Sequence, residues 1–78
     1  MQLFGQAVTG KIIDADTQQP IPFATVRSVA GQAVVANVGG MFSLDFVQSD
    51  TTTIWVQSLG YEVATKLAVK GDFLLIAL

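Results

Sequence analysis

The chain of 78 residues contains no cysteine and no histidine. These two side chains supply the usual zinc ligands, and cysteine is also the source of disulfide bonds and thiolate nucleophiles. Their absence excludes disulfide stapling, thiol chemistry and the usual zinc sites. It also removes the side chain that most often acts as a general base near neutral pH.

Charge is scarce as well. Lys, Arg, Asp and Glu make up 13% of the residues, against about 25% in an ordinary soluble domain, and the net charge is −2. Four cationic side chains are too few for a basic stripe along a phosphate backbone, so we expect no nucleic-acid partner. The hydrophobic fraction of 51% excludes intrinsic disorder.

Long apolar runs are also missing. The longest run, 73–78, has six residues, whereas a membrane-spanning helix needs about 20. Residues 1–5 carry no positive charge and no apolar core, so they do not form a signal peptide. We expect one domain, residues 1–78, that is soluble, does not insert into a membrane and belongs to a larger protein.

What the chain does have is hydrophobic alternation with a period of two, which is typical of β-strands. Turns rich in Gly, Pro, Asn and Asp separate the alternating segments about every 8–12 residues, as in a β-sandwich. The pattern predicts an all-β fold without a helix. The seven expected strands are 6–13, 23–29, 33–38, 41–46, 52–59, 61–69 and 73–78.

The alternation also predicts which side chains share a face of each strand. In the segment 61–69 the apolar face carries Tyr61, Val63, Thr65, Leu67 and Val69, with Glu62 and Lys66 on the other side. The sets expected to share a face in the other strands are Val8, Gly10 and Ile12; Ala24, Val26 and Ser28; Phe42, Leu44 and Phe46; and Ile54 with Val56.

The most distinctive local pattern is the segment 14–26, an acidic polar turn followed by Pro-Ile-Pro-Phe-Ala-Thr-Val. Asp14 and Asp16 have the D-x-D spacing that begins a calcium loop, but the glycine and the final glutamate of that loop are missing. Aspartates also hydrogen-bond their own turn readily. We therefore predict turn capping rather than a metal site or an acid–base pair.

Nucleophilic catalysis needs a base near a hydroxyl or thiol. Only Lys11, Lys66 and Lys70 are available, and no serine stands in an S-x-x-K arrangement. Gly39 and Gly40 lack the Lys-Ser/Thr that completes a phosphate loop, and they predict a hairpin turn instead. The sequence therefore predicts no enzyme, no catalytic residue, no metal site and no cofactor.

Trp55 and Tyr61 are the best candidates for binding by residue type, because flat aromatic rings complement the C–H faces of sugars. The competing interpretation places both rings in the core or against a neighbouring domain. The sequence favours this second interpretation and leaves open whether Trp55 is buried or exposed.

The final strand, 73–78, is apolar on both faces. A half-exposed antiparallel strand should alternate between apolar and polar residues. Either Phe73 and Leu75 point to the surface, or another element covers them. We therefore expect Trp55, Phe73 and Leu75 to form an interaction surface for a neighbouring domain or a protein partner.

Four blocks of the sequence resemble the carboxypeptidase regulatory-like domain family. They are Val8-Thr-Gly10 with the segment 14–26, then the turn 37–44 with its Gly-Met-Phe-Ser-Leu, then Ser-Leu-Gly-Tyr-Glu at 58–62, and Ile-Ala-Leu at 76–78. They occur in the family's order over residues 8–78. One departure is the apolar Val38 in a turn that is usually more acidic.

The resemblance implies a transthyretin-like, seven-stranded antiparallel sandwich with Greek-key connections. It further implies a non-catalytic module, found beside metallocarboxypeptidase domains and as an N-terminal extension of TonB-dependent receptors in Bacteroidetes-type bacteria. The sequences of residues 20–26 and 59–62 are most similar to the domains of TonB-dependent receptors. This similarity implies a location in the periplasm or at the outer membrane. The alternative is a small carbohydrate-binding module that uses Trp55.

Overall fold

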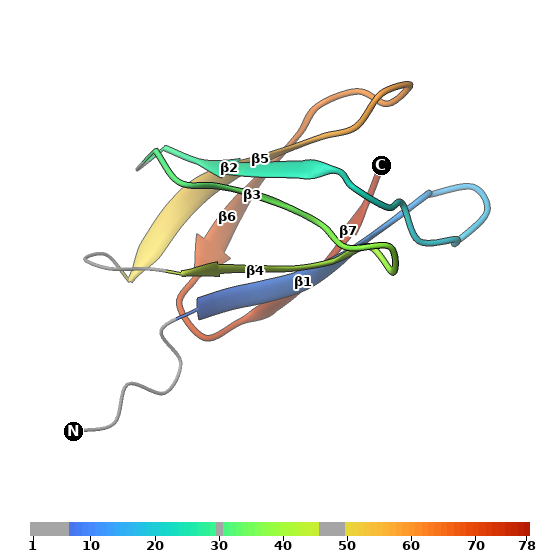
Figure 1. The fold of residues 1–78 in the computed structure, drawn as a ribbon. Coiled ribbons are helices and arrows are strands. Elements are labelled where there is room, and N and C mark those ends of the chain that lie inside the picture. The colour runs from blue at the N-terminus through green and yellow to red at the C-terminus, as the bar shows by residue number, and fades with distance from the viewer. Residues whose placement is uncertain (1–6, 30, 46–49) are drawn as a thin grey trace.

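A computed structural model describes residues 7–29, 31–45 and 50–78 of the chain. These residues form seven strands and no helix (Figure 1). Their order matches the seven predicted segments, and the predicted all-β class is confirmed. The strands are β1 (Ala7–Ile13), β2 (Thr25–Ser28), β3 (Ala33–Val35), β4 (Met41–Asp45), β5 (Thr51–Gln57), β6 (Ala64–Val69) and β7 (Phe73–Ala77).

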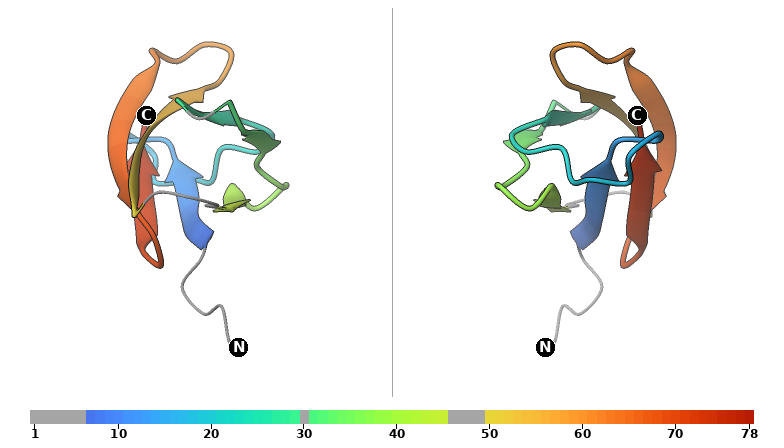
Figure 2. Two further views of the ribbon diagram at one scale, coloured as in Figure 1. Left: turned by 90° about the vertical axis from the view of Figure 1, so that its left-hand side faces the viewer. Right: turned by 90° about the vertical axis from the view of Figure 1, so that its right-hand side faces the viewer.

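The strands form two sheets that lie face to face (Figure 2). One sheet has three strands in the order β4-β1-β7, and the other has four in the order β3-β2-β5-β6. The chain changes sheet after β1, β3, β4 and β6, so segments distant in sequence become neighbours. This arrangement confirms the predicted β-sandwich.

One strand pair departs from the predicted antiparallel arrangement. β1 and β7 run parallel, with Thr9 opposite Phe73 and Ile13 opposite Ala77. A tight hairpin forces its two strands to be antiparallel, whereas strands from distant parts of a chain carry no such constraint. The chain passes from β6 in the four-stranded sheet to β7 in the three-stranded sheet, where β7 pairs with β1. The direction of β7 follows from this crossing between the sheets. The prediction of an entirely antiparallel sandwich is therefore wrong at this pair.

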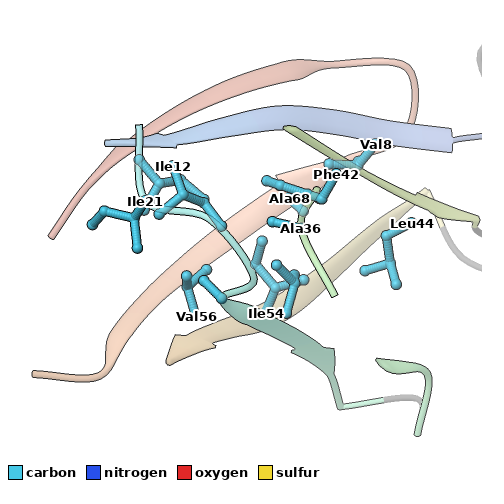
Figure 3. Close-up of a cluster of buried hydrophobic side chains, with 12 residues drawn as sticks. Val8, Ile12, Ile21, Ala36, Phe42, Leu44, Ile54, Val56 and Ala68 are labelled. Carbon is cyan, nitrogen blue, oxygen red and sulfur yellow. The ribbon is translucent and has the colours of Figure 1, made fainter. Parts of the chain in front are cut away.

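The core lies between the sheets and consists of aliphatic side chains with one phenylalanine (Figure 3). In most strands every second residue is buried, as the alternation predicts. The predicted inward faces of β1, β2, β4 and β5 are confirmed over the described residues, and Phe46 lies outside these. The core residues are Val8, Ile12, Ile21, Ala24, Val26, Ala36, Phe42, Leu44, Ile54, Val56, Ala68 and Ile76.

Gly10 occupies an inward position of β1 where the alternation calls for an apolar side chain. A Cβ atom there would lie 2.5 Å from the carbonyl oxygen of Leu74 and 2.6 Å from the ring of Phe42. Glycine is therefore required because β7 and the Phe42 ring approach the backbone of β1 closely.

The predicted face of β6 is wrong. Ala68 is buried, whereas Leu67 is 65% exposed and Val63 and Val69 are exposed too. The register with β5 determines which face of β6 points inward, because residues directly opposite each other share a face of the sheet. Leu67 is opposite Thr53, which faces outward, so Leu67 faces outward too. The larger apolar side chains of β6 therefore point away from the core, and small alanines point into it.

The segment expected as the second strand starts two residues later than predicted. Phe23 has a φ of 63°, in the left-handed region, so extended structure begins only at Thr25. Its backbone N–H donates to the carbonyl of Ala36 at 3.1 Å, which fixes this loop against the end of β3. The third strand also ends early, at Val35, because the turn at Asn37 follows.

Candidate interaction surfaces

The acidic turn contains the capping interactions that the sequence predicts for Asp14. Oδ1 of Asp14 accepts hydrogen bonds from the backbone N–H groups of Asp16 at 2.8 Å and Thr17 at 3.0 Å. Asn37 does the same in the hairpin before β4, where its Oδ1 accepts from Gly39 at 2.9 Å and Met41 at 3.0 Å. Asp14 and Asn37 therefore serve to close these turns.

Tyr61 makes a contact that the sequence does not predict. Its hydroxyl donates to Oδ2 of Asp14 at 2.6 Å, across 47 residues of sequence. The hydrogen bond from Tyr61, followed by those from the backbone of Thr17 and Asp16, lowers the pKa of Asp14. The same hydrogen bond raises the pKa of Tyr61. The hydroxyl of Tyr61 is therefore engaged within the fold, and its ring packs against the core.

The described part of the chain holds no group of three or more acidic, histidine or cysteine side chains that could bind a metal ion. The hydrogen bond between Asp14 and Tyr61 is the first cause of the pKa shift of each group. No helix in the described residues is long and apolar enough to cross a membrane.

Trp55 lies on the outer face of the four-stranded sheet and is 36% exposed. Directly opposite it are Arg27 on β2 and Thr65 on β6, which share this face. Leu67 and Val69 continue the same face along β6, both exposed. We call Trp55, Thr65, Leu67 and Val69 the β5–β6 face.

Phe73 and Leu75 lie on the outer face of the three-stranded sheet and are 57% and 63% exposed. Lys11 on β1 lies between Leu75 and the exposed Met41 of β4, because it pairs with both. We call Met41, Lys11, Phe73 and Leu75 the β7 face. Both side chains therefore lie at the surface of the described part of the chain, where a neighbouring domain or a partner could cover them.

The three residues expected to form one interaction surface therefore lie on opposite outer sides of the sandwich. Trp55 belongs to one sheet and Phe73 and Leu75 to the other, with the core between them. A single flat partner cannot contact both sides at once. The sandwich offers two apolar faces instead of one.

A third region, of mixed polar and apolar side chains, lies at one end of the sandwich, where the loop before β2 meets the loop after β5. An open depression of about 520 Å³ is lined there by Pro22, Phe23, Thr25, Gln57, Ser58, Leu59, Tyr61 and Val63. Phe23 is 65% exposed and Leu59 is fully exposed. The alternation predicts that Phe23 belongs to a strand. In the structure its φ is positive, and the residue lies in the loop before β2.

These observations define a small all-β module with apolar outer faces and, over the described residues, no assembled catalytic or metal centre. Residues 8–75 match the model of the CarboxypepD_reg-like domain family. The chain belongs to this family, which the sequence motifs had indicated. Domains of this kind are regulatory, non-catalytic modules. No curated protein matches the chain at a significant level of similarity.

Proposed function

We propose that the chain is a non-catalytic accessory domain that positions or couples larger parts of an exported bacterial protein. The observation that carries this proposal is the exposure of large apolar side chains on regular strands of both sheets. The backbone that carries these side chains is already ordered in strands, and a few such anchors supply most of the energy of an interface.

The host that fits best is an outer-membrane protein such as a TonB-dependent receptor of a Bacteroidetes-type bacterium, in which the domain is N-terminal. Two observations support this proposal: the chain belongs to the family, and the sequence of residues 20–26 is most similar to its bacterial members. We also propose that the seven strands have the transthyretin-like Greek-key arrangement that the resemblance implies. The partner is then a neighbouring domain of the same polypeptide or a second protein on the periplasmic side.

Cell fractionation tests the host and the location together. An antibody raised against the 78-residue chain should detect a polypeptide much larger than 8.3 kDa in the outer-membrane fraction of the source cells. A species of 8.3 kDa in the cytoplasm would contradict the proposal.

The anchors are tested in the intact host by changing Trp55→Gln on one side and Leu75→Gln on the other. Loss of protection from proteolysis at one face identifies the side that contacts the rest of the protein.

A small carbohydrate-binding module is the second candidate. It is supported by the partial exposure of Trp55 and by the neutral polar and aromatic side chains of the depression near Phe23. The fluorescence of Trp55, the only tryptophan, reports on its own face during titration with neutral oligosaccharides. A saturable shift with one sugar supports this candidate, and no shift with any sugar of a broad panel contradicts a Trp55 site.

A further inference from the structure

β7 has one edge without a partner strand among the described residues. Its other edge pairs with β1. The carbonyl of Asp72 accepts a hydrogen bond from Thr9 of β1, and the N–H of Leu78 donates to the carbonyl of Ile13 at the end of β1. Backbone groups of successive strand residues alternate between the two edges, so those of Leu74 and Ile76 also face β1. The N–H and C=O groups of Phe73, Leu75 and Ala77 therefore point away from the sheet.

The other three sheet edges carry features that discourage pairing with another chain. β3 has only three residues, and β4 ends on the exposed, charged Asp45. β6 carries Lys66 on the inner side of its sheet, since it pairs with the buried Ile54, and a charge in that position is a known protection of an edge strand. β7 contains no charge, no proline and no bulge.

The unprotected edge is also compatible with itself. The segment 73–78 is uncharged, so two copies can approach without like-charge repulsion. In an antiparallel pair centred on Leu75, the two Leu75 side chains lie opposite each other and Phe73 lies opposite Ala77. All of these side chains are on the outer face and exposed, so no core residue has to move.

We propose that β7 pairs antiparallel with β7 of a second copy across a two-fold axis. The two three-stranded sheets then form one six-stranded sheet in the order β4-β1-β7-β7-β1-β4. The contact is short, and interfaces below about 1,200 Å² are weak and transient. The dimer therefore forms in a concentration-dependent equilibrium. The proposal rests on the edge of β7 and is independent of the host and of the accessory role.

Sedimentation equilibrium over a wide range of concentrations tests the association. The weight-average mass of the chain should rise from 8.3 kDa towards twice that value. Leu75→Lys should abolish the rise, because it brings two charges together at the centre of the pair. Leu67→Lys is the matched control, since Leu67 on β6 is exposed to nearly the same degree, 65% against 63%. A rise that Leu67→Lys abolishes and Leu75→Lys leaves intact would overturn the proposal.

Amide hydrogen exchange of the unmodified chain tests the pairing itself. The amides of Leu74 and Ile76 face β1 and should be protected at every concentration. Those of Leu75 and Ala77 should exchange quickly in dilute solution and gain protection as the mass rises. A dimer in which these two amides stay unprotected overturns the proposal, as does a chain that remains monomeric at the highest soluble concentration. Leu75→Pro removes one outward N–H and should weaken association at least as much as Leu75→Lys.

Discussion

The hydrogen bond between Tyr61 and Asp14 joins two turns that are 47 residues apart in the sequence. Replacing Tyr61 by Phe removes the hydroxyl and keeps the ring against the core. We expect a modest loss of unfolding free energy near neutral pH, measured by urea denaturation.

The pH dependence of this loss follows from the two pKa shifts. The lowered pKa of Asp14 contributes stability above its ordinary value of 3.8, and this contribution disappears as pH falls through the lowered pKa. The raised pKa of Tyr61 contributes stability below 10.0 that is lost as pH rises through the raised value. The difference between the wild type and Tyr61→Phe should therefore be constant between these limits and shrink outside them. An equal difference at acid pH would contradict the assignment.

Phe23 is a bulky residue in the left-handed region, a conformation that costs roughly 1–2 kcal/mol for residues other than glycine. Phe23→Gly removes this strain but adds chain entropy to the unfolded state, which costs about 0.5–1 kcal/mol. We expect the unfolding free energy to stay the same or rise by up to roughly 1.5 kcal/mol, from the difference of these two terms. The contrasting variant is Phe42→Ala in the core, which should lose about 3–5 kcal/mol.

The contact of β1 with β7 depends on Gly10. Gly10→Ala places a methyl group against the carbonyl of Leu74, a backbone atom that can move only with the strand. We expect a loss of about 3 kcal/mol, at the upper end of the usual cost of overpacking. Gly39→Ala is the control, because the nearest atom to its Cβ is 3.5 Å away and it should lose less than about 1 kcal/mol. Equal losses in the two variants would argue against the close approach.

The reversed face of β6 yields a paired test in neighbouring residues. Ala68→Leu adds volume to a buried site and should lose about 1–3 kcal/mol. Leu67→Thr acts on an exposed site and should change the unfolding free energy by no more than about 0.5 kcal/mol. The face expected from the alternation predicts the opposite order of effects, so the two variants distinguish the alternatives in one experiment.

The strand elements show how far alternation can be used. It located β1, β2, β4 and β5 and their inward faces, because most large apolar residues of these strands recur at every second position. It placed the wrong face of β6 inward, because this edge strand buries alanine and exposes leucine and valine. The alternation also did not predict that β7 pairs with β1 in parallel, because no local turn connects these two strands.

Over the whole molecule, burial contributes far more to stability than charge does. The described residues contain one ion pair, between Lys70 Nζ and Asp50 Oδ1 at 3.7 Å, and the Asp50 side chain is almost fully exposed. Exposed pairs contribute little and are screened by salt. We expect the unfolding free energy to change by less than about 0.5 kcal/mol between dilute buffer and 0.5 M NaCl. A larger loss in salt would indicate an electrostatic contribution that this pair does not account for.

The sequence by itself determined the all-β class, the order of the seven strands and the family, because alternation and turn chemistry are local properties. It also indicated that Asp14 closes a turn, since this capping uses backbone groups only two and three residues away. The tertiary structure alone decided that Trp55 lies on one outer side and Phe73 and Leu75 on the other. It likewise decided the Tyr61–Asp14 hydrogen bond and the unpaired edge of β7. These features depend on which strands become neighbours, and burial of the whole core sets that choice.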